Sequence, residues 1–100
     1  MEPAKTDGAE ILIEAHDLIV GARQQAYDHP TVDYLRTVNI FRVITGKQLS
    51  VEEGVLFMLA VKLSRLTHEL QTGEHHPDNT RDAIGYLGCL NMVRQSRRRQ

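Results

Sequence analysis

Two short patterns place charged side chains on the apolar faces of predicted helices. Lys62 and Arg65 are three residues apart and Asp78 and Asp82 are four residues apart, so each pair shares one helix face. A charge on an inward face must meet a partner, a metal ion or a ligand, because its removal from water is costly. Since the two pairs carry opposite charges, they predict either an internal ion-pair network or a binding site.

Each pair suits a different ligand. Lysine offers a mobile point charge and arginine a planar fork, so Lys62 and Arg65 together suit a phosphate or carboxylate. Alternatively, both extend from the edge of the core to water. Asp78 and Asp82 are candidate Mg²⁺ ligands, since hard cations prefer oxygen ligands. Alternatively, Asp78 caps a helix, where acids are favoured, and Asp82 pairs with Lys62 or Arg65.

The histidines give a weaker signal. His29 lies close to Arg23 at the turn that follows the first predicted helix, where it either binds an anion or is a surface residue. His68, His75 and His76 match no standard zinc spacing. The one cysteine, Cys89, permits no disulfide within the chain and is interpreted as a buried thiol.

Composition is typical of a globular chain. The 100 residues suffice for one domain, with 41% hydrophobic and 25% charged residues and a net charge of −1. Four arginines lie in residues 94–100, whereas residues 1–93 are acidic. The net charge therefore favours neither a membrane nor a nucleic-acid partner. The arginine tail nevertheless permits a contact with nucleic acid that does not depend on the nucleotide sequence. Residues 1–7 have no apolar signal-peptide core, so we expect a cytoplasmic protein, in the host cell if a phage encodes it.

Helical spacing recurs through the chain, which predicts an all-α fold of four helices joined by short loops in a compact bundle. The first helix spans about 8–27, the second begins with Thr31 as its cap and ends at Gly46, the third spans about 51–71 and the fourth about 78–97. Ser50 and Glu53 form a capping box. We divide the chain into a lead of residues 1–7, one domain of residues 8–96 and a basic tail of residues 97–100.

The same helical spacing predicts which side chains of each helix face the core. The positions expected to point inward are Val32, Leu35, Val38, Phe41 and Ile44 in the second helix, Val55, Leu59, Leu63, Leu66 and Leu70 in the third, and Ala83, Leu87, Leu90 and Val93 in the fourth. Only two Phe, three Tyr and no Trp are available to fill the centre. So small a bundle gains from association with further copies, because association buries more of its apolar surface.

Three segments, 21–30, Lys62–Arg65 and Asp78–Tyr86, resemble in order and spacing a family of short, mostly phage-encoded proteins often labelled MazG-like. This family looks like a branch of the all-α NTP pyrophosphatase superfamily. The resemblance implies a four-helix core that forms dimers or tetramers. It also implies Mg²⁺-dependent hydrolysis of nucleoside triphosphates to the monophosphate and pyrophosphate.

If the protein is an enzyme of this kind, the charges of its own residues suggest their roles. Lys62, Arg65 and Asp82 would be catalytic, and Asp78 and Asp82 would hold Mg²⁺. The residues that would contact a nucleotide or its phosphates are Arg23, His29, Lys62, Arg65 and Tyr86.

This sequence departs from those relatives in several places. Lys62 and Arg65 replace the first acidic pair of the superfamily, and Asn79 and Asp82 stand for the second. Ala22 stands where the closer family usually has an acid, and Asp28 where it usually has glycine. The function that the resemblance implies is a nucleotide pyrophosphohydrolase that acts on nucleoside triphosphates or related nucleotides that carry phosphate. The first alternative is an inactive protein that binds and sequesters a nucleotide, and the second is an accessory nucleic-acid-binding protein that uses the basic tail.

Overall fold

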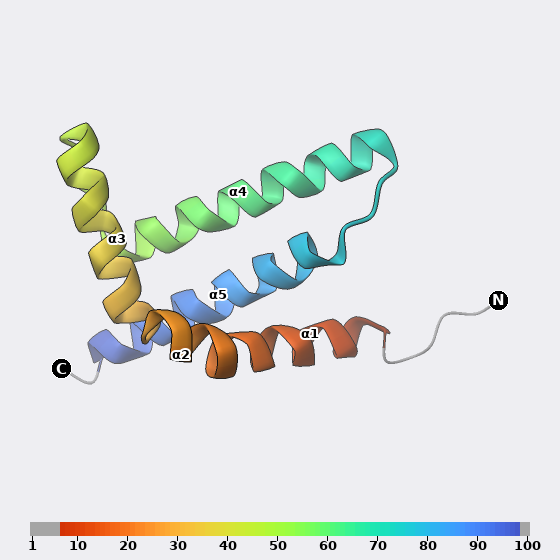
Figure 1. Ribbon diagram of the computed structural model, residues 1–100, viewed down its shortest axis with the longest axis horizontal. Coiled ribbons are helices and arrows are strands. Elements are labelled where there is room, and N and C mark those ends of the chain that lie inside the picture. Colours follow the sequence, from red (N-terminus) through yellow and green to blue (C-terminus); the bar gives the residue numbers. More distant parts are fainter. Residues whose placement is uncertain (1–6, 99–100) are drawn as a thin grey trace.

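The computed structural model describes residues 7–98, and every element in that range is helical (Figure 1). The elements are α1 (Asp7–Asp17), the π-helix η1 (Leu18–Ala22), α2 (Arg23–Tyr27), α3 (Pro30–Thr45), α4 (Val51–Thr72) and α5 (Pro77–Arg98). Because α1, η1 and α2 follow one another without a break, they form the first of four helical segments. The prediction of an all-α chain with four main helices is confirmed.

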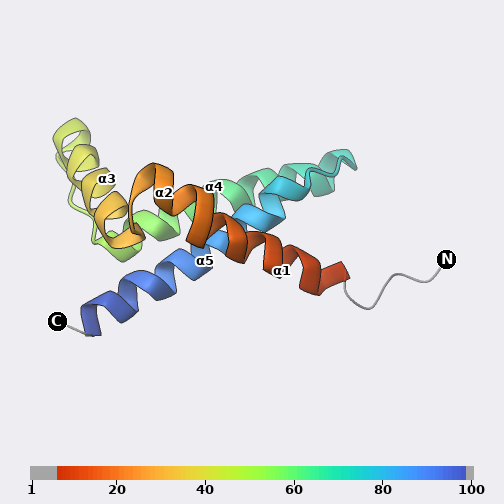
Figure 2. The ribbon, with the colours of Figure 1, turned by 60° about the horizontal axis from the view of Figure 1, so that its bottom comes forward.

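The helices do not all run side by side. α4 and α5 form an antiparallel pair joined by a short loop, and α1 lies across α5 (Figures 1 and 2). α3 stands steeply against this pair, and its C-terminal end projects away from the other helices (Figure 1). The short loops therefore produce antiparallel neighbours at α4 and α5, whereas the last turn of α3, residues 42–45, is exposed.

A small core holds these helices together where α3, α4 and α5 meet. It consists of Tyr34, Val38, Val51, Val55, Tyr86, Cys89 and Val93. Two glycines permit close crossings. A Cβ added at Gly54 would lie 2.6 Å from Val38 Cγ1, and one added at Gly88 would lie 2.9 Å from Ile19 Cδ1. Glycine is therefore required where α3 meets α4, whereas at Gly88 the end of the Ile19 side chain would have to move to admit a Cβ.

Helix ends follow the sequence signals, with one exception. Ser50 accepts a hydrogen bond from the Glu53 amide (3.1 Å) while Glu53 accepts one from the Ser50 amide (2.9 Å), so the predicted capping box is confirmed. Gly46 ends α3 in the left-handed conformation, also as predicted. The cap of α3 is His29, not Thr31, and its Nδ1 accepts from the Thr31 amide at 3.1 Å. Pro30 is the reason, because proline favours the first helical position and shifts the cap to the residue before it.

Several residues expected to face inward are exposed instead. They are Val32 (51% exposed), Leu35 (49%), Ile44 (77%), Leu63 (48%), Leu70 (87%) and Leu87 (52%). Tyr34 and Tyr86 occupy the core in their place. The periodicity correctly predicts helices, but it does not show which faces of these helices stay uncovered in the folded chain.

The C-terminal arginines are partly helical. α5 continues through Arg97 and Arg98, which the sequence assigned to a tail, and Arg97 donates to Glu52 at 2.8 Å. The remaining predictions for residues 1–6 and 99–100 lie outside the described range. Across residues 7–98, no helix is both long and apolar enough to cross a membrane.

Candidate functional site

The predicted contact between the third and fourth helices is present. Lys62 Nζ lies 2.8 Å from Asp82 Oδ2, and the two side chains are only 13% and 21% exposed. Burial alone would raise the pKa of Asp82, but the hydrogen bond and charge of Lys62, assisted by Arg81, hold this pKa below its usual value. The pair therefore joins α4 to α5 through an ion pair whose two side chains are largely buried.

Arg81 joins the two predicted metal ligands. Its guanidinium lies 3.2 Å from Asp82 Oδ1 and 3.4 Å from Asp78 Oδ1. Asp78 thus pairs within the first turn of α5 and does not cap it. Within the described part of the chain, no group of three or more His, Cys, Asp or Glu side chains is arranged to hold a metal ion. A cation at Asp82 would have to displace Lys62 or Arg81, and the Mg²⁺ role stays a prediction.

Arg23 reaches the same region from α2. The amide of Arg23 donates to Leu18 O, which is the bond of a π-helix. This irregular turn changes the direction of the residues that follow it, and π-turns are frequent at functional sites. The Arg23 guanidinium then donates to the Tyr34 hydroxyl at 2.8 Å and lies 5.2–5.9 Å from the ring centres of Tyr27, Tyr34 and Tyr86. Such distances are typical of cation–π contacts.

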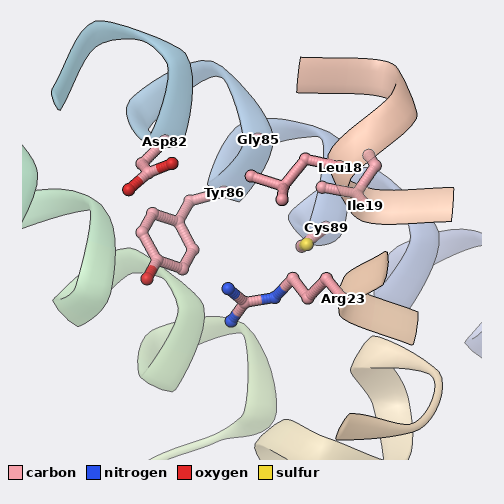
Figure 3. Close-up of a pocket in the computed structure, with 7 residues that line it drawn as sticks. All are labelled: Leu18, Ile19, Arg23, Asp82, Gly85, Tyr86 and Cys89. Carbon is pink, nitrogen blue, oxygen red and sulfur yellow. The ribbon is translucent and has the colours of Figure 1, made fainter. Parts of the chain in front are cut away.

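The space around Arg23 is small. Figure 3 shows its guanidinium directed at the Tyr86 ring, with Cys89 beside it and Asp82 beyond the ring. The cavity that these residues line has a volume of about 10 Å³, enough for about one water molecule. Burial would lower the pKa of Arg23, but the neighbouring Tyr34, Tyr86 and Cys89 groups raise it. Arg23 is therefore a permanent cation, and this cavity is too small for a nucleotide.

A larger concavity lies one helical turn from the Lys62–Asp82 pair. We name it the α4–α5 groove, and its volume is about 480 Å³, within the range of small-molecule sites. Its lining residues come from α4, the loop before α5 and the start of α5: Ser64, Arg65, His68, Glu69, Glu74, His76 and Asn79. Arg65 is exposed here, and no carboxylate of the described residues forms an ion pair with it.

Glu69 forms the floor of this groove and was not singled out in the sequence. Its side chain is buried (7% exposed), and Oε1 accepts from the His76 amide at 2.6 Å and from Asn79 Nδ2 at 3.2 Å. These bonds fix the loop to α4 and set the start of α5. One feature of the sequence pointed to Glu69. An acidic residue in the last turn of a helix interacts unfavourably with the helix dipole, so its presence there indicates another structural or functional role.

The five predicted phosphate contacts fall in different places. Lys62 lies between α4 and α5, Arg65 lines the α4–α5 groove, and Arg23 and Tyr86 line the small cavity. His29 caps α3 and lines a separate hollow near the end of α5. The helices thus bring Lys62, Asp82 and Tyr86 together but separate His29 and Arg65 from Arg23. The roles of these residues in ligand binding stay predictions.

Comparison with known proteins gives a family and one distant relative. Residues 10–94 match the family described as "Domain of unknown function (DUF6378)". The chain is also 31% identical over 83 residues to the "Gene 55 protein" of Mycobacterium phage D29, an alignment that covers 83% of this chain. The chain spans about half, 52%, of the length of that relative. No solved structure matches the chain.

Neither description names a ligand or a reaction, so the resemblance to nucleotide pyrophosphatases stays a prediction. The matched span nevertheless contains the Lys62–Asp82 pair, Arg23 with its three tyrosines and the whole α4–α5 groove. On this match the chain belongs to the DUF6378 family.

Proposed function

We propose that this protein binds a nucleotide, or another small molecule that carries phosphate, in the α4–α5 groove. The observation that carries the proposal is a groove of about 480 Å³ lined by Arg65, an exposed cation with no carboxylate partner among the described residues. An arginine fork matches the geometry of phosphate oxygens.

Two further features support an anionic ligand. His68 and His76 add imidazoles to the groove, and the hydrogen bond that His76 donates to Glu74, which also lines the groove, raises the pKa of His76, so its positive charge persists to higher pH. The buried carboxylate of Glu69 already accepts two hydrogen bonds from the loop and α5, which directs part of its charge away from the ligand. A phosphate group would complete the charge balance at Arg65.

Hydrolysis is the second candidate, and Asp82 is the observation that favours it. Its lowered pKa keeps the carboxylate ionised near neutral pH, and its side chain keeps 21% of its surface in contact with solvent. For Mg²⁺ to bind Asp82, with Asp78 as a further ligand, Lys62 or Arg81 would have to turn away. Lys62 and Arg65 would then neutralise charge on the phosphates, as cationic groups do in phosphoryl transfer. We place either activity in the cytoplasm.

Titration calorimetry with a panel of nucleoside triphosphates tests binding, first with Mg²⁺ and then with a chelator. We expect Arg65→Ala to weaken binding by at least tenfold. Arg94→Ala is the matched control, because it also removes an exposed arginine but lies far along α5 from the groove. If no nucleotide binds below millimolar concentration, or if both variants weaken binding equally, the groove is not the site.

Release of monophosphate and pyrophosphate in the same samples separates the two candidates. Turnover that requires Mg²⁺ and is abolished by Asp82→Ala would identify a pyrophosphohydrolase. Binding that survives the chelator without turnover would identify a sequestering protein. Binding of DNA or RNA that is lost with the C-terminal arginines, in the absence of nucleotide binding, would favour the accessory nucleic-acid role.

A further inference from the structure

The floor of the α4–α5 groove holds a carboxylate oxygen that is open to a ligand. Glu69 is only 7% exposed, and its Oε1 accepts from the His76 amide at 2.6 Å and from Asn79 Nδ2 at 3.2 Å. The second oxygen, Oε2, forms no hydrogen bond within the described residues, and it is not sealed from solvent. Because Glu69 lines the groove, a ligand that enters the groove can donate a hydrogen bond to Oε2.

Asn79 provides a second acceptor beside Glu69. Only the amide nitrogen of Asn79 can donate, so the bond from Nδ2 to Glu69 Oε1 determines how this side chain is turned. The amide oxygen, Oδ1, then points in another direction, and within the described residues no donor bonds it. Asn79 is partly exposed and also lines the groove. Two acceptors on hydrogen-bonded residues therefore lack a donor.

Both acceptors are held in place without a ligand. The carbonyl oxygen of Glu69 accepts from the Gly73 amide at 2.8 Å, and the amide of Asn79 donates to the carbonyl oxygen of His76 at 3.0 Å. With the side-chain bonds of Glu69, these contacts join the end of α4, the loop and the start of α5. An acceptor that is already oriented loses little freedom when a ligand binds, so more of the bond contributes to affinity.

Arg65 lies one helical turn before Glu69 on α4, about 6 Å along the helix axis. Within the described part of the chain no ion pair joins these two residues. A cation that precedes an acid by four residues is the weaker order for such a pair. The groove thus offers a cation that suits a phosphate and, one turn away, two acceptors that suit hydroxyl groups.

We propose that the ligand is a ribonucleotide, whose two ribose hydroxyls donate to Glu69 Oε2 and Asn79 Oδ1 while its phosphates contact Arg65. These ribose contacts rest on the phosphate site proposed at Arg65 and add the sugar to it. The neighbouring hydroxyls of ribose present two donors side by side, and the 5′-phosphates lie across the same ring. Acidic side chains bind ribose hydroxyls in this way in dinucleotide-binding folds. A deoxyribonucleotide would leave one acceptor without a donor.

Calorimetry on the unmodified protein tests the sugar contacts. The probes are adenosine triphosphate, its 2′-deoxy and 3′-deoxy forms, and inorganic triphosphate, each with Mg²⁺. Loss of the hydroxyl that meets Glu69 should weaken binding about tenfold to a hundredfold, and loss of the other hydroxyl should weaken it less, because charged acceptors form the stronger hydrogen bonds.

The same measurements separate failure of the sugar contacts from failure of the phosphate site. If both deoxy forms, or inorganic triphosphate, bind as tightly as adenosine triphosphate, the ribose contacts are overturned and the phosphate site stands. If no probe binds below millimolar concentration, the phosphate site fails and the ribose contacts fail with it. The series decides between these outcomes even if a variant of Glu69 does not fold.

Glu69→Gln assigns the preference to one side chain. Glutamine keeps an oxygen for the bonds from His76 and Asn79 but replaces Oε2 by an N–H group, so the ratio of ribose to deoxyribose affinities should fall severalfold. Glu74→Gln is the matched control for this ratio, because it also removes a carboxylate of the groove, but an exposed one that bonds His76 at 3.0 Å. It should change the affinity for all probes and leave the ratio unchanged. An unchanged ratio in Glu69→Gln that is helical by circular dichroism would overturn the role of Glu69.

Discussion

Asp28 has a backbone conformation that only glycine adopts freely. Its φ is 75° and its ψ is 176°, at the point where α2 ends and the chain turns into α3. In the described range it is the one residue other than glycine with positive φ. A Cβ in this region is strained, so we predict that Asp28→Gly stabilises the protein.

The size of the effect follows from three terms. Relief of the strain contributes about 1–3 kcal/mol. Loss of the Asp28–Arg36 ion pair, whose side chains are 61% and 54% exposed, costs about 0.5 kcal/mol, the ordinary value for an exposed pair. The greater freedom of glycine in the unfolded chain costs about 0.7 kcal/mol. The net expectation is a gain of about 1 kcal/mol, or a rise in melting temperature of about 4–8 °C for a domain of this size.

Urea and thermal unfolding, both at one fixed protein concentration, provide the measurement. Asp28→Ala is the matched control, because it removes the same carboxylate but keeps a Cβ in the strained conformation. The glycine variant should exceed the alanine variant by about 1 kcal/mol or more, while the alanine variant falls below wild type. Equal stability of the two variants would show that Asp28 is not strained and would refute the reasoning.

Three other predictions concern single contacts. Ser50→Ala should lower the free energy of unfolding by about 1 kcal/mol in urea titrations, because it removes the cap of α4; an unchanged midpoint would contradict the capping box. Asp82→Asn should cost about 3 kcal/mol, because Lys62 is left without its partner, whereas Asp82→Leu with Lys62→Met should cost much less. Because the pKa of Asp82 is lower in the folded protein than the unfolded value of 3.8, the stability that Asp82 contributes is present above this value and is lost as pH falls through the folded pKa. Acid unfolding of the wild-type protein and of Asp82→Asn can verify this loss. Glu74→Gln should lower the pKa of His76 toward its ordinary value of 6.5 in an NMR titration, since the Glu74 hydrogen bond is the main cause of the upward shift.

Local signals along the chain were sufficient for the helices and for several of their ends, although they misplaced the cap of α3. The capping box at Ser50 and the glycine at position 46 act within one helical turn, so their effect does not depend on the rest of the fold. The contact between Lys62 and Asp82 was also predictable, because two opposite charges on inward faces of neighbouring helices cannot remain unpaired. The resemblance placed a glycine where Asp28 stands, but the strained conformation of Asp28 was not predicted and comes from the structure.

Only the tertiary structure decided how these helices meet. Periodicity identifies an apolar face, but the same face can pack within one chain or stay exposed. In this structure α3 crosses the other helices steeply, and its residues Leu35 and Val43 are exposed. The π-turn that directs Arg23 toward three tyrosines was not predicted; beside it, Ile19 of η1 packs against Gly88 of α5, a contact between segments far apart in the chain. Glu69 and Arg65 line one groove only because the loop from residue 73 to 76 folds back onto α4, a contact between segments that no spacing along the chain encodes.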